Sequence, residues 1–400
     1  MIEQWGARST GRWMRGTVPV ATLLVTLGLA PGASFAKDPI QVGMAVALTG
    51  YLASYDGQFI DGVKLGVARA NASGGIDGHK IDLHILDDAS NATTGVTDTN
   101  QLLNQFNVSV MLNGLSSAQN AAIEPILERA KVPQLVFSIL PPNPKWAFLV
   151  NLVNERADAL QIDYANQKLH AKKIALVYSQ TPYGQNAAKF MTARAKELGM
   201  EVVFSQAIEP SVTDMTPQMA ALKATGAEAV LDVLTGSTHI VEGKAAATVG
   251  LAVPLVQADD DLPTHMAVAA SYPNTVFDAT AVQIYPDIDD AATKAACGDF
   301  VDAYTKAGDK LSTISGASFG WDAVRIVGKA VTDAGSTKGD ALHAALEKVT
   351  MQGCNTLYKY TVTDHTGQGD VPNETRIAKL GPGGKVEVVF AEPNLRVTEK

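Results

Sequence analysis

The chain has 400 residues, and 46% of them are hydrophobic. This composition is too apolar for a disordered protein, and the length is enough for one large or two medium-sized folded domains. The net charge of −9 leaves no basic surface that could follow a nucleic acid or an anionic membrane, so we expect small molecules as partners and no nucleic acid.

The first 36 residues have the pattern of an export signal. Three arginines precede an apolar stretch from Val18 to Ala30, and Ser34-Phe35-Ala36 has the small-x-small form of a cleavage site. The apolar stretch is too short to span a bilayer comfortably. We therefore expect 1–36 to be a Sec-type signal peptide and the rest to be exported. The alternative is a buried N-terminal helix.

From Lys37 onward, short apolar runs alternate with amphipathic helical patterns. The runs are IQVGMAVAL, IDLHIL, VSVML, QLVFS, KKIALVY, MEVVFS, AEAVLDVL and VPLVQ. Most are apolar at nearly every position, which predicts strands buried on both faces of a parallel sheet. Between them, segments 57–72 and 188–199 carry apolar residues at helical spacing. The last stretch, 358–390, alternates and has Gly-rich turns, which predicts antiparallel edge strands.

The strand-helix rhythm runs through several units and begins again near residue 172. It predicts an α/β architecture with right-handed crossovers and open parallel sheets. The roughly 360 residues that follow the signal exceed what one hydrophobic core usually holds, so we expect two similar lobes.

The only two cysteines are Cys297 and Cys354. In an oxidising compartment an even pair indicates a disulfide. The alternative is two unrelated buried thiols, because a sequence cannot show that two Cα atoms come within bridging distance. No Cys/His set has the spacing of a zinc site, so we expect no metal.

The segment 113–130, NGLSSAQNAAIEPILERA, begins where a predicted strand ends. Ligands of open α/β sheets lie at such points, where helix N-termini expose N–H groups. Ser116 could be a nucleophile in a turn close to G-x-S-x-G, Leu115 to Ser117 could bind a carboxylate, or the serines could only cap the helix. Ala118 replaces the last glycine and no histidine lies in a triad motif, so we favour carboxylate binding.

Enzymatic motifs are missing elsewhere in the chain. We find no G-x-G-x-x-G, no G-x-x-x-x-G-K-[ST] and no H-E-x-x-H. The acid runs Asp87-Asp88 and Asp259-Asp260-Asp261 are of a kind that is mostly solvated. The sequence therefore predicts a binding protein without catalytic residues or a cofactor.

The segment from Ile40 to Asp88 resembles the first lobe of the type I periplasmic solute-binding proteins of ABC transporters. Within them it is most similar to the branched-chain amino-acid (Leu/Ile/Val) binding group. The order and spacing of several motifs extend the resemblance over nearly the whole exported chain. These motifs are Thr49 to Asp56, N-A-x-G-G-I-x-G at Asn71 to Gly78, Leu115-Ser116-Ser117, F-S-x-x-P-P-N-P at Phe137 to Pro144, and Tyr183-Gly184.

The resemblance implies two Rossmann-like lobes with parallel central sheets, joined by a three-segment hinge. The first lobe would contain 37–150 and 280–355, the second 151–279 and 356–392, and 393–400 would be a tail. It further implies a periplasmic monomer that captures a small solute by hinge closure and delivers it to an ABC permease in the inner membrane.

The same resemblance assigns a set of pocket residues. Tyr55 would form an apolar wall, Ser116 and Ser117 would bind the solute carboxylate, and Ser138 would lie on a loop that contacts carboxylate and amine. The alternatives are that Tyr55 and Tyr183 are surface aromatics and that Asp259 is a solvated acid. The full set is Tyr55, Leu115, Ser116, Ser117, Ser138, Pro141, Tyr183, Thr235, Gly236 and Asp259.

Three departures from the family pattern bear on the ligand. Pro141-Pro142 offer no N–H or hydroxyl, Thr235-Gly236 replace an expected aromatic, and Leu115 stands where a hydroxyl is common. A zwitterion needs partners for both charged ends, because an unpaired buried charge is costly. We expect a branched-chain-type amino acid, an aromatic or aliphatic carboxylate, or an amide. The alternatives are a secreted hydrolase using Ser116 and a ligand-sensing module of a receptor system.

Overall fold

The structure is a computed structural model and describes residues 37–308, 314–368 and 375–392. The signal peptide and the C-terminal tail expected at 1–36 and 393–400 lie outside the described residues. Two large sheets and one hairpin form within the described part. No helix in that part has both the length and the apolar character to cross a membrane.

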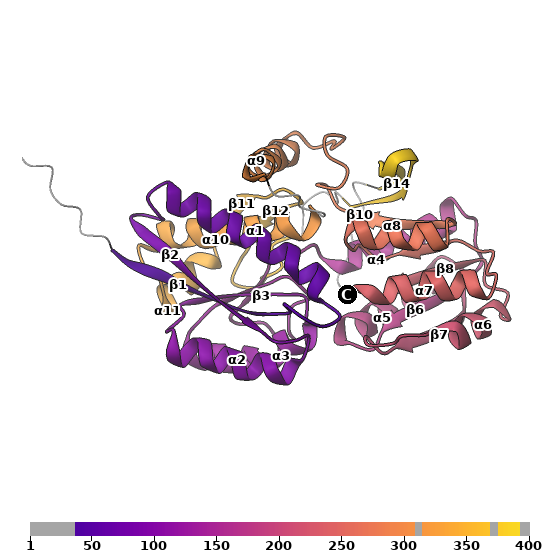
Figure 1. The fold of residues 1–400 in the computed structure, drawn as a ribbon, viewed down its shortest axis with the longest axis horizontal. Coiled ribbons are helices and arrows are strands. Elements are labelled where there is room, and N and C mark those ends of the chain that lie inside the picture. The colour runs from indigo at the N-terminus through magenta and orange to yellow at the C-terminus, as the bar shows by residue number, and fades with distance from the viewer. Residues whose placement is uncertain (1–36, 309–313, 369–374, 393–400) are drawn as a thin grey trace, which may run out of the picture. The chain divides into compact units, whose positions relative to one another are not determined.

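The first sheet is parallel throughout, with strand order β2-β1-β3-β4-β5 (Figure 1). Alternate residues of its central strands contribute to different cores. Val42 and Met44 pack in one cluster, whereas Ala45 packs in another on the opposite face. This explains why the strand reads as a continuous apolar run. The strands are β1 (Lys37–Val46), β2 (His79–Asp87), β3 (Val110–Asn113), β4 (Gln134–Val136) and β5 (Ala147–Leu149).

Helices cover both faces of this sheet, with α1 and α10 on one side and α2 and α3 on the other (Figure 1). The helices are α1 (Ala53–Ala72), α2 (Ala92–Gln105), α3 (Ser117–Ala130), α10 (Ser315–Ala334) and α11 (Gly339–Leu346). Helix α1 approaches α10 closely at Gly62, where a Cβ atom would lie 1.8 Å from the Ala317 carbonyl oxygen. Only glycine fits at such a crossing.

The second sheet has strand order β14-β13-β10-β9-β8-β6-β7. It is parallel except at β13 and β14, which add antiparallel strands at one edge, as the alternation after 375 predicted. In β6, Ile174 and Leu176 face a core shared with α4 and α5, whereas Ala175 and Val177 face a core shared with α6 and α7. The strands are β6 (Lys173–Ser179), β7 (Glu201–Ile208), β8 (Ala229–Val233), β9 (Leu255–Gln257), β10 (Thr275–Ala279), β13 (Arg376–Leu380) and β14 (Val386–Ala391). The helices are α4 (Asn154–Gln167), α5 (Pro182–Glu197), α6 (Thr216–Lys223), α7 (Ser237–Thr248) and α8 (Leu262–Ser271).

The remaining elements are α9 (Ala291–Ala307), β11 (Thr350–Gln352), β12 (Leu357–Lys359) and the short 3-10 helix η1 (Pro382–Gly384). A disulfide joins Cys297 of α9 to Cys354 in the turn between β11 and β12. Both cysteines are fully buried and pack with Phe300 and Trp321. The bridge therefore fixes α9 to the hairpin.

The chain passes between the two sheets at three places. The first crossing follows β5 and the second follows β10. The segment after 355 does not leave the first lobe at once, because Tyr358 and Tyr360 pack in the first-lobe core and β12 pairs with β11 rather than with the second sheet. We propose that the third crossing lies after Tyr360, later than the expected position near 355.

Candidate ligand-binding site

A pocket lies where the carboxyl ends of the strands of both sheets meet. It encloses about 890 Å³, including space open to solvent. Its lining follows the ends of strands in both lobes: Ser138 comes after β4, Thr181 after β6 and Thr235 after β8. Such a position at strand ends is where open α/β sheets bind small molecules. The pocket therefore lies at the strand ends, where we expected a ligand from the sequence.

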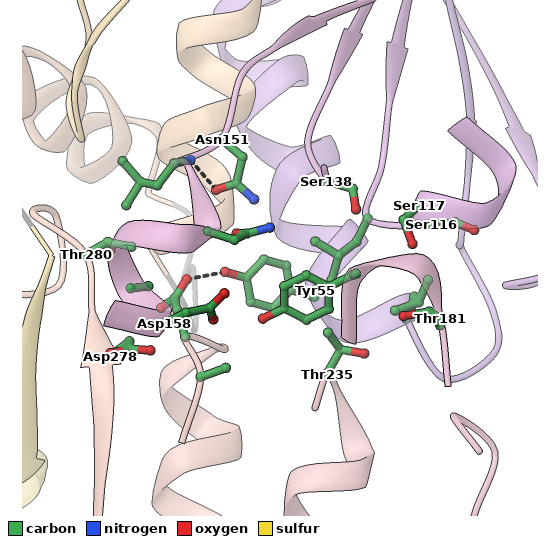
Figure 2. Close-up of a pocket in the computed structure, with 18 of the residues that line it drawn as sticks. Tyr55, Ser116, Ser117, Ser138, Asn151, Asp158, Thr181, Thr235, Asp278 and Thr280 are labelled. Atoms are coloured by element: carbon green, nitrogen blue, oxygen red, sulfur yellow. Dashed lines mark hydrogen bonds between the residues drawn. The ribbon is translucent and has the colours of Figure 1, made fainter. Parts of the chain in front are cut away.

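Hydroxyl and N–H groups form the first-lobe wall. Ser116 caps α3, and its Oγ accepts a hydrogen bond from the Gln119 N–H at 3.4 Å, which leaves the hydroxyl proton free to donate. Ser117 and Ser138 are buried and line the same side of the pocket (Figure 2). The first N–H groups of a helix have no partner within the helix, so α3 adds donors to this wall. Together these groups suit a negatively charged end of a ligand.

The serine loop is held in place from behind by Asp56. Its carboxylate accepts hydrogen bonds from the Leu115 N–H at 2.8 Å and the Ala47 N–H at 3.0 Å. Gly114 lies against the same carboxylate, since a Cβ atom there would meet Asp56 Oδ2 at 2.4 Å. Burial raises the pKa of Asp56 to about 7, and the two N–H donors oppose the shift. Asp56 is thus a positioning residue for the loop.

Tyr55 spans the pocket. Its ring is 4% exposed and stacks on Phe137 with the ring centroids 5.4 Å apart. Its hydroxyl donates a hydrogen bond to Asp259 Oδ2 at 2.6 Å (Figure 2). Because Tyr55 belongs to the first lobe and Asp259 follows β9 of the second, this bond links the two walls. Tyr55 is therefore not a surface aromatic, and Asp259 is not a solvated acid.

The second-lobe wall carries three carboxyl groups, from Asp158, Asp259 and Asp278. Asp158 is 3% exposed and Asp278 is 1% exposed. Figure 2 shows both of them on the side of the pocket opposite the serines. Among the described residues, the lining of this pocket contains no lysine, arginine or histidine. The site thus gathers acidic groups without a counter-charge.

Burial raises the pKa of each of these acids. The pKa of Asp259 rises to about 7, chiefly because the carboxyl is buried, with Tyr55 partly offsetting the shift. The pKa values of Asp158 and Asp278 rise well above the usual range for the same reason, with further repulsion from neighbouring carboxylates. Gln161 donates to Asp278 Oδ2 at 2.6 Å, but the buried Oδ1 atoms of Asp278 and Asp259 have no hydrogen-bond partner. These oxygens are free to accept from a ligand.

The geometry does not support a nucleophilic serine. Ser116 has no histidine beside it in the described pocket lining, and its Oγ caps α3 through Gln119. The buried His239 is bound on both sides, by Asp232 and Asp260 at 2.9 Å each, and lies outside the lining. Although burial opposes it, these carboxylates raise the pKa of His239 well above its usual value, so this ring is a charged structural group and not a base for Ser116.

The comparisons with known proteins agree with this geometry. The family model described as periplasmic binding protein matches residues 39–384. The chain belongs to this family. By that description its members are periplasmic proteins with a binding function. The family and the class of function predicted from the sequence are thereby confirmed.

A curated relative is the Leu/Ile/Val-binding protein homolog 7 of Brucella abortus, 28% identical over 223 residues. The match covers 52% of this chain and 55% of the relative, so the chain spans about half the length of the curated relatives it matches.

Two solved structures share the fold. The branched-chain amino acid transporter substrate-binding protein of Streptococcus pneumoniae, in complex with isoleucine, has a TM-score of 0.76 and 22% identity over 88% of this chain and 100% of that one. A solute-binding protein of an ABC transporter from Rhodopseudomonas palustris, in complex with 4-hydroxybenzoate, has a TM-score of 0.74 and 19% identity over 89% of this chain and 96% of that one. The predicted fold class of two α/β lobes with parallel central sheets is confirmed.

Most of the residues expected in the pocket of this periplasmic binding protein line it. They are Tyr55, Leu115, Ser116, Ser117, Ser138, Tyr183, Thr235 and Asp259. Pro141 and Gly236 do not. Pro141 is buried in the loop after β4 but outside the lining. Gly236 donates its N–H to Asp260, and a Cβ atom there would meet the Tyr51 carbonyl oxygen at 2.5 Å. Gly236 therefore permits close contact between the lobes rather than contact with a ligand.

Several residues that line the pocket were not predicted from the sequence. Thr181 lies two residues after β6 and Thr280 directly follows β10, so the rule that ligands lie at strand ends could have found them. Asn151 likewise follows β5. Asp158 lies inside α4 among other polar residues, and Asp278 lies within β10, so neither had a motif to mark it.

Proposed function

We propose that this periplasmic binding protein is the solute-binding component of an ABC importer and that its solute carries a positively charged nitrogen. The observation that supports this ligand class is the second-lobe wall, where Asp158, Asp259 and Asp278 line a pocket without a basic side chain among the described residues. The segment 369–374, which adjoins the lining residue Thr375, has no basic residue in its sequence either.

The raised pKa values explain why a cation is favoured. A buried carboxylate without a partner is costly, so in the empty pocket these groups hold protons more readily than free aspartates do. An ammonium group placed among them supplies the missing counter-charge and three N–H donors. The partnerless Oδ1 atoms of Asp259 and Asp278 are suited to accept those donors.

The first-lobe wall gives the solute its second feature. Ser116, Ser117 and Ser138, with the start of α3, present donors that suit a carboxylate. A solute with both groups, such as an amino acid, would span the pocket from the serines to the acids. The Streptococcus pneumoniae neighbour holds isoleucine, which has both groups, and the Rhodopseudomonas palustris neighbour holds 4-hydroxybenzoate, which has no cationic nitrogen. The acidic wall favours the first kind of ligand over a bare carboxylate.

Capture would proceed by closure of the two lobes. The walls belong to different lobes, so a solute that contacts both stabilises the closed arrangement relative to an open one. The bond from Tyr55 to Asp259 joins the two lobes, so separating the walls would break it. In this proposal the closed monomer then delivers its solute to a membrane permease, after export directed by residues 1–36.

A matched set of solutes tests the ligand class. L-leucine, 4-methylpentanoate and 3-methylbutylamine share one carbon skeleton and differ only in which charged groups they carry; the corresponding phenylalanine set adds a larger side chain. We expect the amine-bearing members to raise the melting temperature, because a ligand that binds only the folded protein stabilises it by mass action. Calorimetry on each hit then gives its Kd.

Two results would contradict the proposal. If the carboxylic acids without nitrogen bind as tightly as the amine-bearing members, the acidic wall does not select the solute. If a panel of amino acids, amines and carboxylates yields no ligand at all, the assignment as a solute-binding component for small organic molecules is wrong.

A further inference from the structure

Two histidines and a glutamate come together in the first lobe, away from the pocket. His343 lies in α11, Glu347 follows one helical turn later on the same face, and His365 lies in the turn after β12. One ligand atom from each residue lies within 4.8 Å of the other two. None of the three lines the solute pocket. The cluster thus joins two segments that are distant in sequence.

Backbone carbonyls orient both rings. His343 Nε2 lies 2.7 Å from the Lys145 carbonyl oxygen, and His365 Nδ1 lies 3.0 Å from the Ala147 carbonyl oxygen. A carbonyl only accepts, so each of these nitrogens must carry the proton. In the neutral rings the opposite nitrogens, His343 Nδ1 and His365 Nε2, then carry free lone pairs. This is how a metal-binding histidine is usually oriented by its surroundings.

The free nitrogens face the carboxylate at a distance too long for a hydrogen bond. His343 Nδ1 and His365 Nε2 lie 3.9 and 3.8 Å from Glu347 Oε1. His365 is 7% exposed, and its Nε2 is buried without a hydrogen-bond partner. A buried polar atom without a partner needs an explanation. An ion between these atoms supplies one.

We propose that His343, Glu347 and His365 bind a divalent transition-metal ion of the zinc class. Two ligands at about 2.1 Å from a tetrahedral ion lie about 3.4 Å apart, so the two distances to Glu347 need to shorten by about half an ångström, and the two histidine nitrogens, which lie within 4.8 Å of each other, must close on the ion as well. Imidazole nitrogens suit Zn²⁺, Co²⁺ or Ni²⁺ and disfavour Mg²⁺ and Ca²⁺, which prefer oxygen ligands. Three protein ligands leave a fourth position for water.

The surroundings hold the ligands near this geometry. Trp146 packs on the His343 ring and Phe148 stacks on the His365 ring, each with centroids 4.2 Å apart. The His365 carbonyl oxygen accepts a hydrogen bond from the Leu149 N–H at 2.9 Å. The scaffold on which the three side chains stand is therefore rigid before any ion arrives.

An ion here would also stabilise the start of the first crossing between the lobes. The turn that carries His365 continues to Gln368, whose side chain accepts from the Val153 N–H and donates to the Asn151 carbonyl oxygen. Binding should therefore raise the melting temperature of the solute-free protein, because the ion ties α11 to this turn and requires the folded state.

The test uses the full chain without an affinity tag, freed of metal with EDTA. Calorimetric titration with ZnCl₂ should show one ion bound, and MgCl₂ should give no signal. Glu347→Gln removes the anionic ligand, and His365→Asn keeps an amide donor for the Ala147 carbonyl while removing the free nitrogen. Each should weaken Zn²⁺ binding by more than about tenfold. His170→Asn is the matched control, since His170 is exposed and asparagine tolerates its positive φ of 54°.

Two further measurements complete the experiment. Far-UV circular dichroism checks that the variants fold, and anomalous diffraction from wild-type crystals grown with ZnCl₂ locates the ion without relying on any variant. An ion bonded to the three side chains supports the site. The proposal is overturned if the wild-type chain binds no Zn²⁺, if both variants bind it as tightly as the control, or if the ion lies elsewhere.

Discussion

Replacing Asp259 by asparagine tests the charge of the second-lobe wall while keeping its shape. Asp259 Oδ2 accepts the 2.6 Å hydrogen bond from the Tyr55 hydroxyl, and an asparagine oxygen can accept the same bond. With that bond kept, the asparagine NH2 group takes the place of Oδ1, so the variant loses both the negative charge and the acceptor proposed for the solute. A hydrogen bond to a charged group contributes about 1.5–3 kcal/mol, so the Kd for an amine-bearing solute should rise about 10- to 150-fold.

The pH dependence of binding provides a second measure of the same group. The pKa of Asp259 is raised to about 7, chiefly by burial. Below this pH the empty site holds a proton that the cation must displace, so the affinity falls by about tenfold for each further pH unit. Between pH 8 and pH 5 this amounts to a loss of about 100-fold for one carboxyl. The pKa values of Asp158 and Asp278 are also raised, so they steepen the dependence.

Calorimetry from pH 5 to pH 8, in two buffers of different ionisation enthalpy, gives both the Kd and the number of protons released. Wild-type protein should bind an amine-bearing solute more tightly as the pH rises and should release protons at the lower end. Asp259→Asn should show a shallower slope. Asp214→Asn is the control, because Asp214 is exposed and distant from the pocket lining. An affinity that is constant or rises on acidification would refute the charge argument.

Three further changes test other parts of the structure. Gly236→Ala should weaken solute binding more than Gly226→Ala does, because both substitutions strain a position of positive φ but only at Gly236 does the Cβ atom meet a first-lobe carbonyl oxygen, at 2.5 Å, whereas Gly226 has nothing within 4 Å; equal calorimetric Kd values for the two would be contrary evidence. Ser117→Ala should weaken the binding of solutes that carry a carboxylate by about 10- to 150-fold and leave the binding of simple amines unchanged, so a uniform loss in calorimetry would speak against carboxylate binding. Replacing Cys297 and Cys354 by serine should lower the free energy of unfolding in urea by about 4 kcal/mol, since the bridge closes a loop with a sequence separation of 57; two free thiols in the exported protein, seen by mass spectrometry, would count against the bridge.

The architecture could be predicted because the sequence shows burial on both sheet faces directly. In β6, Ile174 and Leu176 face one helical layer while Ala175 and Val177 face the other, so no polar residue interrupts the run. The strands predicted at the antiparallel edge were harder to assign to a sheet. Tyr358 alternates with its neighbours as an edge-strand residue would, yet its ring is fully buried in the first-lobe core. Alternation reports that one face is buried, but not which sheet or hairpin the strand joins.

A local sequence signal marked only the first-lobe side of the pocket, and the family resemblance supplied Tyr183, Thr235 and Asp259 on the other side. The serine wall is contiguous in sequence and begins a helix, so Leu115 to Ser117 had a local signal. The acidic wall is assembled from α4, from the loop after β9 and from β10, and no short pattern connects Asp158 to Asp278. Pro141 lies outside the lining, so the departure there does not bear on the pocket; in our proposal the acceptors for a cationic nitrogen are these distant carboxyls.

The acidic second-lobe wall affects the free energy of closing the two lobes. The carboxyl groups belong to the second lobe, and one of them, Asp259, is bonded to Tyr55 of the first lobe. Closing an empty pocket therefore removes water from ionised groups that lack a counter-charge, which is unfavourable unless they first take up protons. A cationic nitrogen removes this cost by pairing with the same oxygens. When Asp259 loses its charge, closure of the empty protein should become easier, and a cationic solute should favour the closed state less strongly.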